Sequence, residues 1–424
     1  MMIAAGVIRY DTNPSPLSEP FSAEKPFIAM SIKLSSRVQA VKPSPTLAVT
    51  ARAAELRAAG KDVIGLGAGE PDFDTPEHIK DAARQAIADG RTKYTAVDGT
   101  PGLKQAIIAK FKRDNGLDYK PEQILVSCGG KQSFYNLAQA ILDPGDEVII
   151  PAPYWVSYPD MSILAGGVPV LVHAGDDQDF KITPAQLRGA LTDKTRLFVI
   201  NSPSNPTGMA YSRDELAELG EVLREFPKVA IATDDMYEHI RWDLDRPFVN
   251  ILNACPDLAN RTLVLNGVSK AYAMTGWRIG YAGGPVEVIK AMKKIQSQST
   301  SNPTSISQYA AEAALNGPQD CIGEMLAQFK KRHDYVVERL NGMRGIECLK
   351  TDGTFYVFPS VKGLIEALDG VNDDLQLAEH LIVHAGVALV PGTAFGLSGH
   401  VRISIATSMQ NLENALDRIE RMIG

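Results

Sequence analysis

The sequence has few of the features that place a protein in a specialised class. No apolar run approaches the roughly 18 to 20 residues needed to span a bilayer, so we expect no membrane partner. The formal charge of -7 is spread along the chain without a run of like charges, which leaves no basic stripe for a phosphate backbone. The sequence therefore excludes an ordinary membrane protein and predicts no nucleic-acid partner.

Cysteine is also scarce, with 4 residues in 424. Cys128, Cys255, Cys321 and Cys348 have neither the spacing of metal ligands nor an obvious disulfide framework, which is typical of a reducing compartment. Residues 1–8 are too short for a secretory signal and lack its basic flank. We therefore expect a cytoplasmic protein that holds no metal.

What the chain does have is enough apolar content for a large core. With 45% hydrophobic and 22% charged residues, a chain of this length is expected to form roughly two or three domains. Residues 1–29 stand apart because they are rich in Pro, Ser and Ala and show no apolar period. We interpret them as a disordered arm or an extension from an upstream translation start.

After Met30, strand and helix patterns alternate along the chain. Residues 63–67 form a short strand pattern, and Thr75 precedes Pro76 as the expected N-cap of a helix toward Ala88. Buried-strand patterns, most of them followed by helical spacing, occur at residues 124–127, 147–150, 196–200, 229–233 and 261–265. This alternation predicts an α/β domain with a mostly parallel central sheet.

The pattern changes beyond about residue 310. A long helix is expected over residues 322–340, with short strands near residues 354–358 and 400–404. We therefore expect a large domain over residues 76–310 and a smaller α+β domain over residues 311–424. Residues 30–75 are expected to form an N-terminal arm and part of the small domain.

Polar side chains follow several of these strands. Lys270 stands eight residues before Arg278, in a stretch rich in Gly and aromatic residues, and Asp234 and Tyr237 follow the strand at residues 229–233. Taken singly, such residues are more often surface charges, helix caps or turn formers. Because ligands of open α/β sheets bind at the carboxyl ends of the strands, their coincidence favours a binding site there.

These loops carry motifs that resemble a known family. The strings occur in order at residues 69–76, 92–94, 129–132, 153–159, 205–208, 234–237 and 269–281. The chain resembles the class I, fold-type I aminotransferases that depend on pyridoxal 5'-phosphate (PLP), and most closely the bacterial aspartate aminotransferase branch, over residues 31–424. The resemblance implies bound PLP and a homodimer with shared active sites.

The resemblance also implies the roles of the residues around the PLP ring. Lys270 would carry the cofactor as a Schiff base and then shuttle the substrate proton. Asp234 would face the pyridine nitrogen, while Tyr237 and Asn205 would bond the phenolic oxygen. Trp155 matches the aromatic residue that stacks on the ring face.

The phosphate of the cofactor needs backbone N–H groups and a planar cation. The residues implied there are Gly129, Gly130, Lys131, Ser269 and Arg278. Tyr94 matches a residue that reaches the phosphate from the neighbouring subunit. Gly267 departs from many relatives, which have a serine three residues before the Schiff-base lysine, so phosphate binding is expected to depend more on Arg278 and Ser269.

For the substrate, Arg402 matches the arginine that grips the α-carboxylate, and Gly69 matches the backbone position beside it. Trp155 and Asn205 also border this site by resemblance. Better-known relatives place an arginine for the distal carboxylate before a Ser-Asn-Pro string, but residues 298–303 contain no cation. We expect Lys131 and Thr46 to take that role; the alternative is that Lys131 only neutralises the phosphate.

Two other motifs are weaker. Residues 65–69 resemble a fragment of a dinucleotide fingerprint, but Glu70 and Pro71 follow where its helix should start. His380 and His384 have the spacing of zinc ligands on a helix, yet no metalloprotease glutamate or third ligand accompanies them. We interpret them as packed or surface histidines.

The expected reaction interconverts L-aspartate and 2-oxoglutarate with oxaloacetate and L-glutamate in two half-reactions, and some members of the branch also aminate prephenate. The alternatives are other PLP enzymes on the same fold, such as an aromatic aminotransferase, a C–S lyase or a cyclopropane-forming synthase. A transcription regulator is disfavoured because the first 29 residues are too few for a DNA-binding domain and are not basic.

Overall fold

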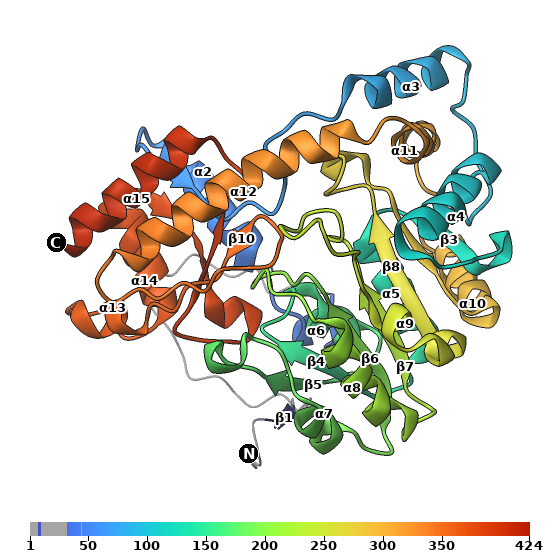
Figure 1. Cartoon of the computed structure of the whole chain (residues 1–424), viewed down its shortest axis with the longest axis horizontal. Helices are drawn as coiled ribbons and strands as arrows, with labels where there is room; N and C mark the ends of the chain where they lie inside the picture. Colours follow the sequence, from blue (N-terminus) through green and yellow to red (C-terminus); the bar gives the residue numbers. More distant parts are fainter. Residues whose placement is uncertain (1–6, 10–31, 44) are drawn as a thin grey trace.

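A computed structural model describes residues 7–9, 32–43 and 45–424 (Figure 1). Its central feature is an eight-stranded sheet of order β1-β5-β4-β6-β7-β8-β9-β3. The parallel strands are β5 (Val168–His173), β4 (Glu147–Ala152), β6 (Thr195–Asn201), β7 (Ala230–Asp234) and β8 (Thr262–Gly267). β9 (Gly280–Gly283) lies antiparallel between β8 and β3 (Ile124–Ser127). The predicted mostly parallel sheet is confirmed.

Helices cover both faces of this sheet, so that the inner strand β8 and even the edge strand β3 are buried along their whole length. One face packs against α5 (Gly130–Ile141), α6 (Ser157–Leu164) and α10 (Val286–Ser297). The other is covered by α4 (Pro101–Asn115), α7 (Pro184–Ala190), α8 (Arg213–Arg224), α9 (Ile251–Ala254) and α11 (Ser305–Asn316), and α3 (Glu77–Ala88) packs on α11.

One edge of the sheet involves the segment expected to be disordered. β1 (Val7–Arg9) pairs antiparallel with β5, with Val7 opposite Val172 and Arg9 opposite Val170. The rest of residues 1–29 lies outside the described residues, so the interpretation of this arm stays a prediction.

A second sheet belongs to the C-terminal part of the chain. It consists of β10 (Tyr356–Val357), β13 (Val401–Ser404) and β12 (Val390–Pro391), all antiparallel. α12 (Asp320–Asn341) and α15 (Met409–Ile423) share its apolar core, and Figure 1 shows α12 extending from beside α11 toward α15. The division into domains at residues 76 and 311 stays our proposal.

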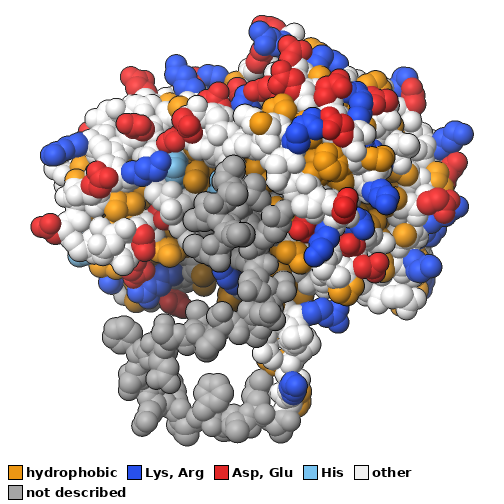
Figure 2. Space-filling view, turned by 90° about the horizontal axis from the view of Figure 1, so that it is seen from below, with side chains coloured by type: hydrophobic (Ala, Val, Ile, Leu, Met, Phe, Trp, Pro, Cys, Tyr) orange, Lys and Arg blue, Asp and Glu red, His pale blue; other side chains and the backbone are white. Residues whose placement is uncertain are grey.

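The remaining elements connect these layers. β2 (Ile64–Gly65) pairs with β11 (Val387–Ala388), so the N-terminal segment lies against the C-terminal one. The other α-helices are α1 (Ser36–Ala40), α2 (Pro45–Ala58), α13 (Lys362–Ala367) and α14 (Asp374–His380). In the described part of the chain, no helix is long and apolar enough to cross a membrane. Acidic and basic side chains are intermixed on the face in Figure 2.

The start of α3 differs from the sequence prediction. Pro76 occupies the N-cap position and makes no side-chain cap. The Thr75 hydroxyl instead donates to the Ala273 carbonyl (2.7 Å) and accepts from the Trp277 indole (3.0 Å). The prediction that Thr75 caps α3 is wrong because its hydroxyl bonds the loop after Lys270, which is distant in the sequence.

Candidate active site

A cavity of about 370 Å³ lies where the carboxyl ends of β6, β7 and β8 meet residues of the second sheet. Most of the predicted site residues border it: Thr46, Gly69, Gly130, Lys131, Trp155, Asn205, Asp234, Tyr237, Ser269, Lys270, Arg278 and Arg402. Gly129 directly precedes Gly130, the first of these residues on α5. Tyr94 does not line the cavity in this subunit, and its side chain is 90% exposed.

Lys270 lies in the loop after β8, with its side chain half-buried at the cavity wall. Its Nζ donates to the carbonyl oxygen of Gly69 at 2.5 Å. Burial lowers the pKa of Lys270 to about 8, helped by the charge of Arg402 and opposed by Glu70. Roughly one tenth of this amine is therefore neutral at pH 7, far more than for an ordinary lysine, and the neutral form is the one that a nucleophile or base requires.

Asp234 is the last residue of β7 and borders the same cavity. Its Oδ2 accepts the hydroxyl hydrogen of Tyr158 (2.5 Å), and its Oδ1 accepts from the backbone of Met236 (3.2 Å). Burial raises the pKa of Asp234, although the Tyr158 hydrogen bond opposes this. A carboxylate held in this way can stabilise a cationic nitrogen placed in the cavity.

Arg402, on β13, is only 2% exposed. Its Nη1 donates to Asn205 (3.0 Å) and its Nη2 to the Gly67 carbonyl (2.8 Å), while its Nε has no hydrogen-bond partner among the described residues. Its guanidinium carbon lies 4.3 Å from the centre of the Tyr356 ring. Burial lowers the pKa of Arg402. A buried guanidinium with an unused donor is suited to an anionic ligand.

A second guanidinium lies at the start of α5. Arg278 adopts a left-handed backbone conformation, and its Nη1 donates to the Thr275 carbonyl (2.7 Å). A Cβ at Gly129 would overlap the Arg278 guanidinium, and one at Gly280 would overlap the backbone of Gly130. As the first residue of α5, Gly130 has no intrahelical acceptor for its N–H group. Backbone donors and a cation thus meet at one point.

Lys131 is the third cation of the cavity. Its Nζ lies 5.3 Å from the centre of the Trp155 ring, and burial lowers the pKa of Lys131, with Arg278 acting in the same direction. Among the described residues, Lys131, Arg278 and Arg402 have no carboxylate within ion-pair distance. Thr46 borders the same cavity from α2.

Further residues of the cavity wall were not predicted from the sequence, among them Glu70, Asn201, Met236 and Tyr356. Asn201 joins two strand ends, because its Nδ2 donates to the Asp234 carbonyl and its Oδ1 accepts from Asn205 (both 2.8 Å). The Tyr237 and Tyr356 hydroxyls lie 3.2 Å apart. Glu70 stands inside a motif already noted, whereas only tertiary packing brings Tyr356 to the site.

This sheet order, with a lysine, a carboxylate and three cations gathered at the strand ends, defines a fold-type I transferase. Residues 61–419 match the family Aminotransferase class I and II. The chain therefore belongs to the class I and II aminotransferases, which are PLP-dependent enzymes.

Individual relatives support this assignment. The chain is 60% identical over 397 residues to the aspartate/prephenate aminotransferase of Nitrosomonas europaea, covering 92% of this chain and 100% of that protein. It is 57% identical to the aspartate/prephenate aminotransferase of Cereibacter sphaeroides, covering 91% of this chain and 98% of that protein. The resemblance inferred from the sequence is confirmed.

Solved structures agree. The crystal structure of the aspartate aminotransferase from Rhizobium meliloti matches with a TM-score of 0.90 and 50% identity, covering 93% of this chain and 99% of that one. The aspartate aminotransferase from Thermus thermophilus with maleate matches with a TM-score of 0.86 and 45% identity, covering 92% of this chain and 99% of that one.

Proposed function

We propose that this aminotransferase interconverts L-aspartate and 2-oxoglutarate with oxaloacetate and L-glutamate, and that it also accepts prephenate. The names of its relatives support both substrates. The observation that carries the proposal is that, besides Lys270, the cavity has three cations without carboxylate partners among the described residues: Lys131, Arg278 and Arg402. They match in number the anionic groups of the reaction, which are the cofactor phosphate and two substrate carboxylates.

The cavity residues fit PLP. Lys270 would attach it covalently, and Asp234 would hold its pyridine nitrogen, because a carboxylate raised in pKa by burial gains from a cationic partner. Tyr237 and Asn205 would bond its phenolic oxygen, and Trp155 would cover its ring. The phosphate would be bound by Gly129, Gly130, Ser269 and Arg278. When bound, PLP supplies an electron sink for negative charge at the substrate Cα.

The protein's own part in the reaction is to orient the substrate and to move a proton. Arg402 would bind the α-carboxylate with its planar fork and thereby fix the direction of the Cα–H bond. Lys270, whose pKa of about 8 leaves part of it neutral, would take the Cα proton. The Gly69 carbonyl, which accepts from the Lys270 amine at 2.5 Å, would help to aim it.

Lys131 and Thr46 would recognise the distal carboxylate of the substrate. The Thermus thermophilus enzyme was solved with maleate, a dicarboxylate, which supports a dicarboxylic ligand for this cavity. A lysine is a point charge on a flexible stem, so it tolerates side chains of differing length better than a bidentate arginine does. With a lysine at this position, the enzyme can accept both aspartate and the bulkier prephenate.

We also propose a homodimer with shared active sites. Tyr94 is 90% exposed in the single subunit, so its side chain is available to a partner subunit. Tyr94 of the partner subunit would then reach the cofactor phosphate. The cysteines of the described chain are free, which agrees with the proposed cytoplasmic location.

The test is a set of steady-state assays of the PLP-loaded enzyme with 2-oxoglutarate as amino acceptor. Aspartate should give the highest kcat/KM, and a neutral aliphatic amino acid should be a poor substrate. In a separate assay with glutamate as amino donor, prephenate should be turned over as the amino acceptor. Efficient turnover of aromatic amino acids with little activity on aspartate would support the aromatic aminotransferase instead. Release of ammonia and pyruvate from cysteine conjugates would support a C–S lyase.

A further inference from the structure

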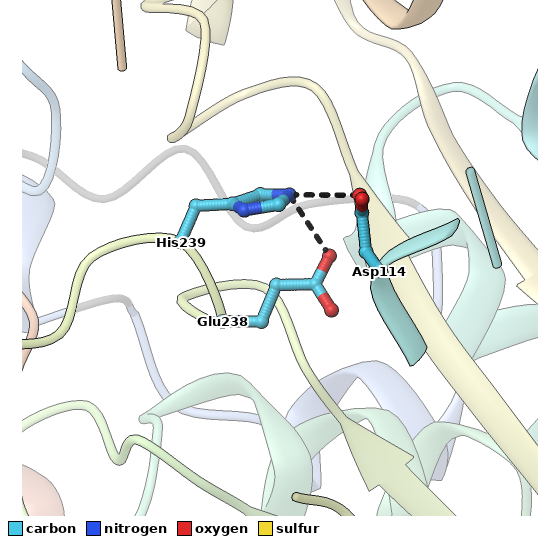
Figure 3. Close-up of side chains that lie close together, drawn as sticks. All are labelled: Asp114, Glu238 and His239. Carbon is cyan, nitrogen blue, oxygen red and sulfur yellow. Dashed lines mark ion pairs between the residues drawn. The ribbon is translucent and has the colours of Figure 1, made fainter. Parts of the chain in front are cut away.

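A buried polar cluster lies behind the active site, between α4 and the loop after β7. In Figure 3 the side chains of Asp114, Glu238 and His239 point toward one another. The His239 Nε2 lies 3.4 Å from Asp114 Oδ2 and 3.3 Å from Glu238 Oε1. These donor atoms lie close enough together to hold a metal ion.

The cations around the cluster make a metal site a poor fit. Lys110, only 1% exposed, forms an ion pair with Glu238 and lies 3.8 Å from Asp114. Arg113 donates from two nitrogens to the two oxygens of Asp114, at 2.6 and 3.0 Å. Because both carboxylates already have cationic partners, a metal ion would have to displace Lys110 and Arg113. The cluster is better explained as a structural connection between segments of the active site.

Glu238 is the centre of this cluster, with 3% of its surface exposed. Besides the ion pair with Lys110, its Oε2 accepts from the Asn115 amide at 2.6 Å and its Oε1 from the Asn266 amide at 2.8 Å. Asn115 also accepts from Lys110 at 2.7 Å. Every hydrogen-bonding oxygen of this buried carboxylate is therefore used.

These contacts join two segments of the active site. Glu238 directly follows Tyr237 and stands four residues after Asp234. Asn266 stands near the end of β8, four residues before Lys270, and its side-chain oxygen accepts from the Gly267 N–H at 2.7 Å. The Glu238–Asn266 hydrogen bond thus connects the loop that carries Asp234 and Tyr237 to the strand that leads to Lys270.

Met236 makes a second connection in the same loop. A Cβ built on Gly130 would meet its terminal carbon at 2.5 Å, and one built on Gly267 would meet it at 3.2 Å. Met236 therefore packs against the glycine turn of α5 and the end of β8 together. A shift of the loop that carries Met236 would therefore also disturb Gly130 and Gly267 at the wall of the cavity.

We propose that Glu238 is a positioning residue of the active site, which fixes Asp234 and Tyr237 relative to Lys270 through Asn266 and is held ionised in the core by Lys110. This proposal rests on the proposed function, because the positioning role of Glu238 matters only if the cavity binds PLP. Glu238 does not line the cavity, so it acts only through the residues that do.

The charge state of the cluster agrees with this role. Burial by itself raises the pKa of Glu238, but the charge of Lys110 and the hydrogen bonds from Asn115 and Lys110 outweigh it and leave the pKa below its usual value. The same balance lowers the pKa of Asp114, where His239 and Arg113 supply the hydrogen bonds. Hydrogen bonds to ionised carboxylates are stronger and more directional than neutral ones.

The test compares Glu238→Gln, Asn266→Ala and the double variant with a control, Asp98→Asn. Asp98 suits the comparison because it also pairs with a poorly exposed lysine of α4, Lys104 at 2.6 Å, and neither residue lines the cavity. Three quantities are measured: the Kd for PLP added to the apoenzyme, the pH midpoint of the visible absorption of bound PLP, and the Tm of the apoenzyme.

We expect Glu238→Gln and Asn266→Ala each to weaken PLP binding by about 10-fold and to shift the absorption midpoint by about 0.5 pH unit. The double variant should lose less than the sum of the two, because one hydrogen bond joins the residues. Asp98→Asn should lower the Tm while leaving the PLP Kd and the midpoint unchanged.

The proposal is overturned if Glu238→Gln and Asn266→Ala lower the Tm as Asp98→Asn does but keep the wild-type Kd and midpoint. Should Glu238→Gln fail to fold, Asn266→Ala decides alone, because it leaves the Lys110–Glu238 pair intact and removes only the Asn266 amide, which bonds Glu238 and the Gly267 N–H. Failure of the wild-type protein to bind PLP at all would instead count against the proposed function.

Discussion

Tyr158 donates its hydroxyl hydrogen to the Asp234 carboxylate at 2.5 Å, from helix α6 to the end of β7. The bond favours the ionised carboxylate in a place where burial disfavours it. Asp234 can therefore stay charged and oriented while it borders the cavity.

The first prediction concerns this bond. Tyr158→Phe should raise the pKa of Asp234 further, because a donor to the charged form is lost, and should weaken PLP binding by about 10-fold. A PLP titration of the apoenzyme measures this. The control is Tyr211→Phe, which removes another tyrosine hydroxyl that accepts from the Ile182 N–H at 2.9 Å outside the active-site cavity. Equal PLP affinity in both variants would contradict the role given to Tyr158.

The glycine turn at α5 gives a second prediction. Gly129 has a φ of 87°, and a Cβ there would overlap the Arg278 guanidinium, so Gly129→Ala should displace Arg278 and abolish tight PLP binding. Gly116 has a φ of 67° with open space around it, so Gly116→Ala should cost only about 1 kcal/mol of stability. Wild-type PLP affinity in Gly129→Ala would show that the turn tolerates the overlap.

Local patterns in the sequence predicted the continuous apolar strands well. The expected strand at residues 124–127 and the helix at residues 322–340 coincide with β3 and α12 to within two residues. β5 and β9 were not predicted, for physical reasons. β5 contains Pro169, which weakens a strand pattern, and β9 (Gly280–Gly283) is half glycine and owes its extended form to its neighbours β8 and β3.

The residues of the active site also fall into two groups, those that the sequence could predict and those that it could not. Asp234, Tyr237 and Lys270 could be proposed as site residues because they stand at or just after the ends of β7 and β8, whereas Arg402 lies within β13 and was inferred from the family resemblance. The Glu238 cluster could not be predicted, because its bonds to Asn115 and Asn266 join segments 123 and 28 residues apart, and no local pattern records such pairs. Tyr356 reaches the cavity for the same tertiary reason, whereas Met236 stands inside the motif at residues 234–237.

The pH dependence of stability is a third prediction. The pKa of Lys270 falls from 10.5 to about 8 on folding, so between these values the unfolded chain binds more protons and the stability of the apoenzyme rises with pH. Below pH 8 the full cost of burying the ammonium is present. Lys270→Met should therefore stabilise the apoenzyme below pH 8, by on the order of 1–2 kcal/mol after allowance for solvent screening at the cavity.

That gain should disappear as the pH rises through 10.5, the ordinary pKa of lysine. Denaturant unfolding at pH 7 and at high pH measures it. The control is Lys290→Met, whose lysine side chain is 63% exposed and pairs with Glu287 at the surface. A stability difference for Lys270→Met that does not change with pH would contradict the lowered pKa.

A chain that starts at Met30 is the fourth prediction. Val7–Arg9, the described part of residues 1–29, do not line the active-site cavity, and the family resemblance begins only after Met30, so we expect kcat and KM to be unchanged. The truncation removes the edge strand β1 and its pairing with β5, which predicts a stability loss of no more than about 2 kcal/mol. Thermal unfolding and steady-state kinetics of the two chains check this. A large loss of activity would show that the arm contributes to the site.

The last prediction tests how the substrate side chain is recognised. Lys131 borders the cavity, has no carboxylate within ion-pair distance among the described residues, and lies over the Trp155 ring. Burying an unpaired substrate carboxylate in a closed site costs several kcal/mol of binding free energy. Removal of this cation should therefore lower kcat/KM mainly for dicarboxylic substrates. Lys131→Ala should lower kcat/KM for aspartate by roughly 1.5 to 3 kcal/mol in transition-state binding, and much less for a neutral amino acid. The PLP Kd is the internal control, because Arg278 remains to bind the phosphate. Equal losses for both substrates together with weakened PLP binding would show that Lys131 serves the cofactor phosphate and that another group receives the distal carboxylate.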